Sequence, residues 1–150
     1  MYTEDVPWDA AEAEVLRGAQ RVEIAERYGT PDSEPGTAPS AVDITVFVLV
    51  RGDDGAAIGC GGLRQIDDVS GEVKRMYVKP ESRGTGAADA VLDALEKHAS
   101  ARGWTHLRLE TGDRQPDAIA FYRRRGFERI ANFGHYADSD NSLCFERELH

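Results

Sequence analysis

The sequence holds one segment whose residue types and spacing suit the binding of a phosphate. Residues 83–88 read Arg-Gly-Thr-Gly-Ala-Ala and lie between an expected strand and an expected helix. The first amides of a helix lack partners within the helix and carry the positive end of its dipole, so they can bind an anion. Gly84 and Gly86 would let the backbone approach phosphate oxygens, and Arg83 adds a permanent positive charge. The segment predicts a site for a phosphate-bearing ligand, and an ordinary strand-to-helix loop is the alternative.

Two further side chains are singled out because the family resemblance described below implies that they transfer protons. Glu72 begins the expected strand that leads into the turn, and Tyr122 lies in a later expected helix. A carboxylate can accept a proton and a phenol can donate one. The alternatives are an edge carboxylate paired with Lys74 or Arg75, and a core tyrosine whose hydroxyl is satisfied. Regular alternation puts Glu72 on the same strand face as Lys74 and Met76, so its orientation depends on local twist or a bulge.

The elements that must position these residues follow from the spacing of apolar residues and turn formers. Strands are expected at residues 2–6, 42–50, 57–66, 72–78, 104–110, 127–130 and 143–149, and helices at about 9–28, 87–103 and 117–125. Tight turns at 52–55 and 67–71 make the central strands an antiparallel meander, and the last strand is expected to close the sheet. The first helix is expected to bury an apolar stripe made of Val15, Val22, Ile24 and Tyr28.

The composition fits a chain that folds as one domain. A chain of 150 residues can bury a sizeable core but is too short for two domains, so residues 1–150 are expected to form one unit. The net charge of −9 argues against a protein that binds nucleic acid, because phosphates require a basic face. The longest apolar run, Val46 to Val50, is too short to span a membrane, and residues 1–6 lack the pattern of a secretory signal. These features predict a cytoplasmic protein with no membrane and no nucleic-acid partner.

The cysteines and histidines do not follow a metal-binding pattern. Cys60 and Cys144 lie in strand-like surroundings and are expected to be small buried residues rather than a disulfide pair. No ligand spacing links either cysteine to the four histidines, or the histidines to one another. The sequence therefore predicts a protein without a metal.

Two segments of the chain resemble signatures of one family, the GNAT superfamily of N-acetyltransferases. Residues 83–88 match the signature Arg/Gln-x-x-Gly-x-Gly/Ala, and the strand before them ends in Val-x-Pro, as in that family. Residues 118–127, which read Ala-Ile-Ala-Phe-Tyr-Arg-Arg-Arg-Gly-Phe, resemble the second signature, Ala-x-x-x-Tyr-x-x-x-Gly-Phe. The order of the expected elements extends the resemblance over essentially the whole chain. It implies an α/β fold of the α+β type, with helices flanking a mixed, mostly antiparallel central sheet.

The resemblance implies an acyltransferase that uses acetyl-CoA as cosubstrate. Amides from Arg83 to Ala88 would hold the coenzyme pyrophosphate, and the strand backbone at Met76 to Val78 would pair with the pantetheine arm. Gln115 stands where many members have an asparagine that touches this arm. The implied coenzyme-binding residues are Met76, Tyr77, Val78, Arg83, Gly84, Thr85, Gly86, Ala87, Ala88, Gln115, Ala118 and Phe121.

By the same resemblance, Tyr122 is the general acid that protonates the departing thiolate. Glu72 is the general base that takes a proton from the amine, directly or through water, and the amide of Val78 would meet the developing oxyanion. Because the motifs place neither cysteine as a nucleophile, transfer is expected to be direct, in a ternary complex. The arginines at 123–125 could reach the ribose phosphate of the coenzyme, although a solvated helix face is favoured for at least two of them.

The sequence leaves the acceptor open. The acidic balance of the chain favours a primary amine of a small molecule, such as a polyamine, an amino acid derivative or an aminoglycoside-like compound. A protein or peptide acceptor is an alternative that needs an open groove, and a loop at residues 29–40 that closed the cleft would argue against it. A non-catalytic acyl-CoA sensor is a third alternative. Residues 133–142 are expected to form an acceptor wall, and family members often dimerise, so a homodimer is also allowed.

Overall fold

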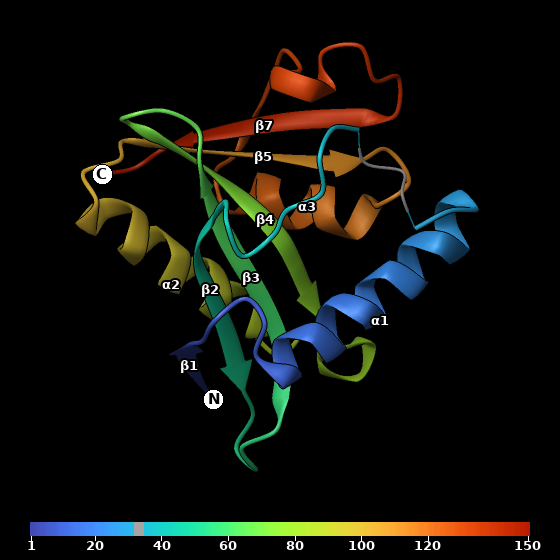
Figure 1. Cartoon of the computed structure of the whole chain (residues 1–150), viewed down its shortest axis with the longest axis vertical. Coiled ribbons are helices and arrows are strands. Elements are labelled where there is room, and N and C mark those ends of the chain that lie inside the picture. Colours follow the sequence, from blue (N-terminus) through green and yellow to red (C-terminus); the bar gives the residue numbers. More distant parts are fainter. Residues whose placement is uncertain (32–34) are drawn as a thin grey trace.

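Helices cover both faces of one sheet in the computed structural model, which describes residues 1–31 and 35–150 (Figure 1). The strands are β1 (Tyr2–Asp5), β2 (Ile44–Arg51), β3 (Ala57–Gln65), β4 (Ser70–Val78), β5 (His106–Gly112), β6 (Glu128–Ile130) and β7 (Ser142–Glu148). The α-helices are α1 (Ala11–Tyr28), α2 (Ala87–Ala101) and α3 (Pro116–Arg124), and short 3-10 helices are η1 (Pro80–Ser82) and η2 (Gly134–Tyr136). All the expected helices and strands are present, with small shifts at their ends.

The sheet is mixed and mostly antiparallel. Its strands pair in the order β1-β2-β3-β4-β5-β7-β6, and β4 with β5 is the parallel pair within the described residues. This confirms the expected fold class. The expectation that the last strand closes the sheet is wrong, because β7 lies between β5 and β6. A strand with two partners satisfies its backbone groups on both sides, and the short β6 forms the edge instead.

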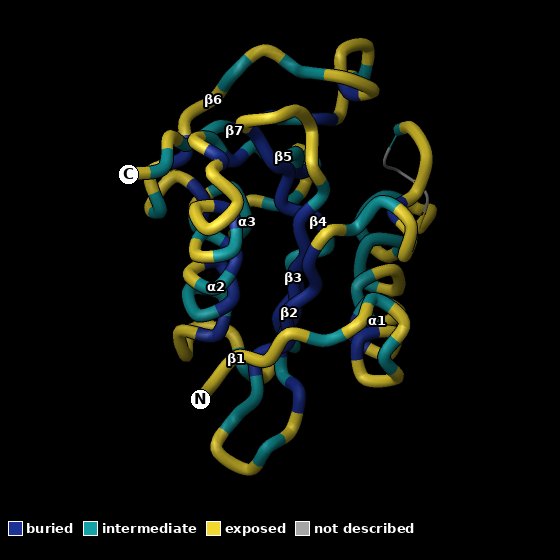
Figure 2. The backbone as a smooth tube through the Cα atoms, turned by 60° about the vertical axis from the view of Figure 1, so that its left-hand side comes forward, coloured by how far each residue is buried: buried dark blue, intermediate teal, exposed yellow. Residues whose placement is uncertain are grey.

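Two hydrophobic cores lie on opposite faces of the sheet, under α1 on one side and under α2 and α3 on the other (Figure 2). The side chains of β2 alternate between them. Val46, Val48 and Val50 belong to the core that contains α2, and Phe47 and Leu49 belong to the core that contains α1. A strand buried on both faces needs a continuous apolar run, which this segment supplies. The helical spacing of α2 places one apolar stripe on the sheet: Ala87, Val91, Leu92, Leu95 and Ala99.

The buried face of α1 differs from the expected stripe. Val15 and Val22 are 68% and 61% exposed, so their assignment to the stripe is wrong. The buried residues of this helix are Ala13 and Leu16. Helical spacing carries the same face onward to Gln20, whose amide donates a hydrogen bond to the Met76 carbonyl at 2.8 Å. Ile24 and Tyr28 of the expected stripe follow on this face, are half-buried and line a cavity described below, so Gln20 is a polar residue within a mostly apolar inward face.

A bulge in β4 interrupts the regular alternation of its side chains. Arg75 has a φ of 57°, and the register between β3 and β4 shifts at this point. Val73 belongs to the core under α2, whereas Tyr77, four residues later, belongs to the core under α1. Regular alternation would put both on one face, so the bulge adds one residue to β4. As a result, Glu72 shares a face with Tyr77 rather than with Val78.

Candidate functional site

The candidate site lies where β4 and β5 separate. Their parallel ladder joins residues 70–72 to residues 106–108, and no further pair between them forms in the described part of the chain. The two arrows diverge beyond this ladder in Figure 1. The amide of Lys79 donates to Ile58 on β3, and backbone groups alternate in direction along a strand, so the amide of Val78 points away from β3. The last residues of β4 therefore present backbone groups to an opening within the sheet.

A groove of about 550 Å³ borders this opening and reaches the start of α2. It brings together residues that are far apart in the sequence, from α1, β4, α2 and α3. The predicted coenzyme-binding residues that line it are Met76, Tyr77, Val78, Arg83, Gly84, Gly86, Ala87, Ala88, Gln115, Ala118 and Phe121. Thr85 does not line the groove. It is exposed and donates its hydroxyl to the Ser82 carbonyl at 2.5 Å, which stabilises the turn. The role of all these residues as coenzyme ligands stays a prediction.

The start of α2 has the geometry of an anion site. Gly84 and Gly86 adopt φ values of 79° and 93°, a conformation that side chains rarely tolerate. Gly86 is the N-cap and no side chain caps the helix. The amide of Ala90 bonds to the Gly86 carbonyl, so the amides before it have no acceptor within the helix. The residues that carry these amides, Ala87, Ala88 and Asp89, line the groove, so a helix start suited to an anion borders it.

Arg83 fixes the turn to its surroundings. Its Nε donates to the Val78 carbonyl at 3.0 Å, and its guanidinium lies 2.9 Å from a carboxylate oxygen of Glu23 on α1. The arginine therefore joins β4, the turn and α1 while it lines the groove. We expect it to hold the wall of the groove as well as to supply positive charge.

A smaller cavity of about 120 Å³ adjoins the groove. Both are lined by Gln20, Met76, Gln115, Ala118 and Tyr122, so these residues mark the place where the two spaces meet. The end of α1 and the segment that follows it also border the cavity, through Tyr28 and Pro31 respectively. Of the predicted loop at 29–40, residues 32–34 lie outside the described residues.

The expected acceptor wall at residues 133–142 contributes to the cavity at one end. Asn141 and Ser142 line it, and the Ser142 hydroxyl donates to a carboxylate oxygen of Glu110 at 2.6 Å. Tyr136 lies behind the lining and its hydroxyl is 2.9 Å from Nζ of Lys74. Residues 133–142 therefore border the cavity partly by direct lining and partly by support of Lys74.

Tyr122 lies at the junction of the groove and the cavity. Its ring packs edge-on against Phe121 and Phe127, with centroid distances of 5.3 Å and 5.6 Å. No hydrogen bond reaches its hydroxyl from the described residues. Burial raises the pKa of the Tyr122 phenol above its usual range, so the hydroxyl keeps its proton at neutral pH. A phenol in this state can donate a proton to a group in the groove.

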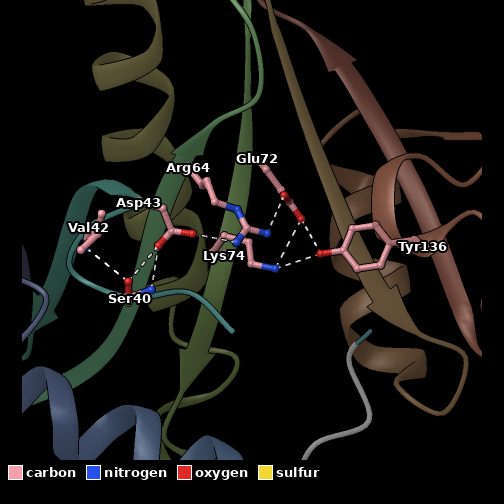
Figure 3. Close-up of polar contacts among 7 residues, drawn as sticks. All are labelled: Ser40, Val42, Asp43, Arg64, Glu72, Lys74 and Tyr136. Carbon is pink, nitrogen blue, oxygen red and sulfur yellow. Dashed lines mark hydrogen bonds and ion pairs between the residues drawn. The ribbon is translucent and has the colours of Figure 1, made fainter. Parts of the chain in front are cut away.

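Glu72 lies in a buried polar network rather than on the lining of either space (Figure 3). Its carboxylate accepts a hydrogen bond from the Tyr136 hydroxyl at 2.6 Å and lies 3.4 Å from Nζ of Lys74. On the other side it lies 3.3 Å from the guanidinium of Arg64, which also binds Asp43 at 3.0 Å. The pairing of Glu72 with Lys74 was one of the alternatives open from the sequence. Its role as the general base stays a prediction, and a water molecule or a cavity-lining side chain would have to relay the proton.

The three consecutive arginines have three different surroundings. Arg124 lines the groove. Arg125 binds α2 through Asp89 and Asp93, at 3.1 Å and 2.6 Å, and so fixes α3 against α2. Arg123 lies over the Phe145 ring. One of the three is therefore placed to reach a ligand in the groove.

Several groove residues were not found from the sequence. Gln20, Glu23 and Arg27 come from α1, and Asp117 comes from the first turn of α3. The α1 residues lie three or four apart and so share a helix face, which is a signal that the sequence contains. The signal is weak because the same spacing occurs on any solvated helix face. It acquires meaning only when α1 is known to pack beside β4.

The cysteines have the surroundings of buried, unreactive thiols. Both are buried, which confirms the expectation of small buried residues, and the structure contains no bond between them. Burial raises the pKa of the Cys60 thiol to about 12 and also raises the pKa of Cys144. Neither lines the groove or the cavity. Among the described residues, no cluster of His, Cys, Asp or Glu could hold a metal ion, and no helix is long and apolar enough to cross a membrane.

Comparison with known proteins finds relatives that share both sequence and fold. Residues 14–127 match the profile of the acetyltransferase (GNAT) family. An IAA acetyltransferase of Azospirillum brasilense is 34% identical over 137 residues, which cover 87% of this chain and 89% of that protein. The crystal structure of a Klebsiella pneumoniae protein assigned as an acyl-CoA N-acyltransferase is 30% identical, with a TM-score of 0.83 over 99% of this chain and 97% of that one.

A third comparison shows the fold with a ligand. The PaiA N-acetyltransferase of Thermoplasma acidophilum, solved in complex with coenzyme A, has a TM-score of 0.71 over 99% of each chain at 20% identity. These findings confirm the resemblance inferred from the two signatures.

Proposed function

The chain belongs to the acetyltransferase (GNAT) family and is an acetyl-CoA-dependent acyltransferase, and from this premise we propose that it acetylates a primary amine of a small molecule by direct transfer. The observation that carries the proposal is the junction of a long groove with a small cavity at Tyr122 and Met76. A donor in the groove and an acceptor in the cavity would meet there. Because the strands of the sheet extend from Tyr2 to Glu148, we propose that residues 1–150 act as one N-acetyltransferase domain.

The coenzyme would lie along the groove with its pyrophosphate at the start of α2. The left-handed glycines, the amides without helical partners and Arg83 supply the donors and the charge that a diphosphate requires. The pantetheine arm would occupy the opening beside residues 76–78, where strand-like pairing with backbone groups is available. This arrangement brings the thioester to the inner end of the groove, near Tyr122.

The chemistry would need one proton removed and one proton supplied. The lone pair of the neutral amine attacks the acetyl carbon, and the amide of Val78 points into the opening where an oxyanion would develop. Collapse breaks the carbon–sulfur bond, and the electron pair leaves with sulfur. The protonated Tyr122 hydroxyl would give that sulfur a proton, and a base, assigned to Glu72 through water, would take the proton from the amine.

The size of the cavity supports a small acceptor. A volume of about 120 Å³ suits a compact molecule, and Tyr28 and Pro31 belong to the lining of this small space. The name of the Azospirillum brasilense relative, IAA acetyltransferase, refers to an individual compound rather than to a protein acceptor. We therefore favour a small molecule over a protein or peptide acceptor, and a homodimer stays a prediction.

The test is turnover of acetyl-CoA across a panel of amines and peptides, with the release of free thiol and the mass of the product as readouts. We expect acetylated small amines and no acetylated enzyme when the acceptor is omitted. An acetyl-enzyme trapped without acceptor would contradict direct transfer. Faster acetylation of peptides would favour the alternative acceptor class, and coenzyme binding without turnover of any acceptor would favour a sensor.

A further inference from the structure

Among the described residues, three polar side chains line both the groove and the cavity: Gln20, Gln115 and Tyr122. Tyr122 keeps its proton at neutral pH and would give it to the departing sulfur. Gln115 lies beside the Tyr28 hydroxyl and is expected to touch the pantetheine arm. The third, Gln20, comes from α1 and lies where a donor in the groove would meet an acceptor in the cavity.

The carboxamide of Gln20 has a fixed orientation. Its Nε2 donates a hydrogen bond to the Met76 carbonyl at 2.8 Å. Because a carbonyl oxygen can only accept, the nitrogen of the carboxamide must face Met76 and the oxygen must face away from it. The backbone of β4 therefore decides which end of the Gln20 side chain is presented to a ligand.

The oxygen of this carboxamide is accessible. No hydrogen bond reaches Oε1 of Gln20 from residues 1–31 or 35–150. The buried side-chain oxygen without a partner in this part of the chain is Oδ1 of Asn132, so Oε1 of Gln20 is not enclosed by protein. Because Gln20 lines both spaces, a ligand at their junction can reach this oxygen. The junction therefore offers a hydrogen-bond acceptor, from Gln20, as well as a donor, from Tyr122.

The helix that carries Gln20 is attached on both sides of the opening between β4 and β5. Glu23 binds Arg83, in the turn after β4, at 2.9 Å. The Tyr28 hydroxyl accepts a hydrogen bond from the amide of Arg114, in the segment after β5, at 2.8 Å. A side chain on a helix held in this way keeps its position when a ligand binds, which is a requirement for orienting a reacting group.

A neutral primary amine presents one lone pair and two N–H groups to its surroundings. In the proposed transfer the lone pair forms the bond to the acetyl carbon, and one N–H proton goes to the base. The second N–H stays on the nitrogen and becomes the N–H of the product amide. An acceptor that binds this second N–H fixes the direction of the lone pair, and such positioning of a nucleophile lowers the barrier to attack.

We propose that Oε1 of Gln20 accepts a hydrogen bond from the attacking amine, through the N–H that the product retains, and so orients the lone pair toward the acetyl carbon. This proposal rests on the proposed function, because it takes the cavity as the acceptor site and the groove as the coenzyme site.

The proposed contact makes Gln20 a determinant of the class of amine that reacts. A secondary amine has a single N–H, and the base must take its proton. The second carbon substituent of such an amine would then face the Gln20 oxygen and leave it without a donor. The site should therefore prefer primary amines to secondary amines.

Two substitutions of similar size separate this role from a structural one. Gln20→Met removes both the donor and the acceptor, whereas Gln20→Glu removes the donor to Met76 but keeps an acceptor oxygen. Each variant is assayed with a primary amine and with its N-methyl derivative, at saturating acetyl-CoA. Gln65→Met is the matched control, because the Gln65 amide also donates to a backbone carbonyl, that of Asp67 at 3.0 Å, and lies outside both spaces.

The measured quantity is the ratio of kcat/KM for the primary amine to kcat/KM for its N-methyl derivative. Loss of one hydrogen bond typically costs a factor of about 3 to 10, so we expect this ratio to fall by about five- to tenfold in Gln20→Met. The ratio should stay within about threefold of the native value in Gln20→Glu and in Gln65→Met. An equal fall in Gln20→Met and Gln20→Glu would show that Gln20 only satisfies the Met76 carbonyl, and would overturn the proposal. A higher KM for acetyl-CoA in Gln20→Met, with an unchanged ratio, would assign Gln20 to the coenzyme and would also overturn it.

A binding measurement separates failure of this proposal from failure of the proposed function. The acetylated primary amine and its N-methyl derivative, of which only the first has an N–H, are titrated calorimetrically into the protein loaded with coenzyme A. Binding that favours the N–H compound by about three- to tenfold in the native protein, but not in Gln20→Met, would support the contact. If no amine releases thiol, the proposed function fails and this proposal fails with it. Turnover of primary amines, with no preference lost in Gln20→Met by either measurement, would retain the function and remove the role of Gln20.

Discussion

Replacement of Tyr122 by phenylalanine removes one hydroxyl from the junction of the groove and the cavity. The ring contacts with Phe121 and Phe127, at 5.3 Å and 5.6 Å, do not involve the oxygen and are retained. No hydrogen bond to that oxygen is seen from residues 1–31 or 35–150, so the substitution breaks none. We expect the free energy of unfolding of Tyr122→Phe to lie within about 0.5 kcal/mol of the native value.

The expected kinetic effect is much larger than the effect on stability. Transfer of a proton by a positioned side chain typically contributes a factor of about 10²–10⁴, which corresponds to about 3–5 kcal/mol of transition-state stabilisation. Burial raises the pKa of the Tyr122 phenol above its ordinary value of 10.0, so the native hydroxyl stays protonated as pH rises from about 6 to 9. We expect kcat of Tyr122→Phe to fall by at least about 100-fold across that range, with little change in KM for acetyl-CoA.

The assay is steady-state release of free thiol, measured with the best acceptor and combined with urea unfolding of each variant. Tyr2→Phe is the matched control, since Tyr2 is 53% exposed and lies outside both spaces. A decrease in kcat of less than about threefold would refute the role of Tyr122 as the general acid. An increase in KM for acetyl-CoA at unchanged kcat would instead assign the tyrosine to coenzyme packing.

Three further substitutions or conditions test other parts of the structure. Gly86→Glu should weaken acetyl-CoA binding at least about tenfold in calorimetry. The control is Gly55→Glu, which has the same left-handed strain at a φ of 84° and should bind acetyl-CoA normally. Equal affinities of the two variants for acetyl-CoA would argue against the anion site. Glu72→Gln should lower the free energy of unfolding, measured by urea denaturation, by about 3 kcal/mol, because it leaves buried cations without their counter-charge. A loss below about 1 kcal/mol would show that the network contributes little to stability. Burial raises the pKa of the Cys60 thiol from 9.0 to about 12, so ionisation of this thiol favours the unfolded chain. The free energy of unfolding should therefore decline as pH rises from about 9 toward 12. A free energy of unfolding that does not change over this pH range would contradict the prediction.

The sequence was sufficient for the features that depend on local geometry. The glycines at 84 and 86 predicted a turn with an open backbone at the start of α2, because glycine adopts positive φ without strain, and the binding of a phosphate there stays a prediction. The apolar stripe of α2 was also predicted, because five residues at helical spacing have one common face. The predicted coenzyme-binding residues line one groove except Thr85, whose hydroxyl bonds within the turn instead.

The features that depend on contacts between distant elements were not predicted. The predicted apolar stripe of α1 was half wrong: Val15 and Val22 are exposed, whereas Ile24 and Tyr28 line the cavity. The inward face also carries the polar Gln20 where it borders β4, which a search for apolar residues could not select. The bulge at Arg75 has no glycine or proline to mark it, and it changes which residues share a face with Glu72. The network around Glu72 joins residues from four segments, and no sequence spacing relates Tyr136 to it.

The short ladder between β4 and β5 divides the sheet into two parts that few backbone pairs connect. Within the described chain, residues 70–72 and 106–108 alone connect these two strands, and beyond them backbone amides near Val78 face a gap. A coenzyme seated in the gap would act as a removable strand beside β4, between Met76 and Gln115 at the start of α3. Its arrival would slow hydrogen exchange of the end of β4, so this part of the unliganded enzyme would be the more flexible of its two states.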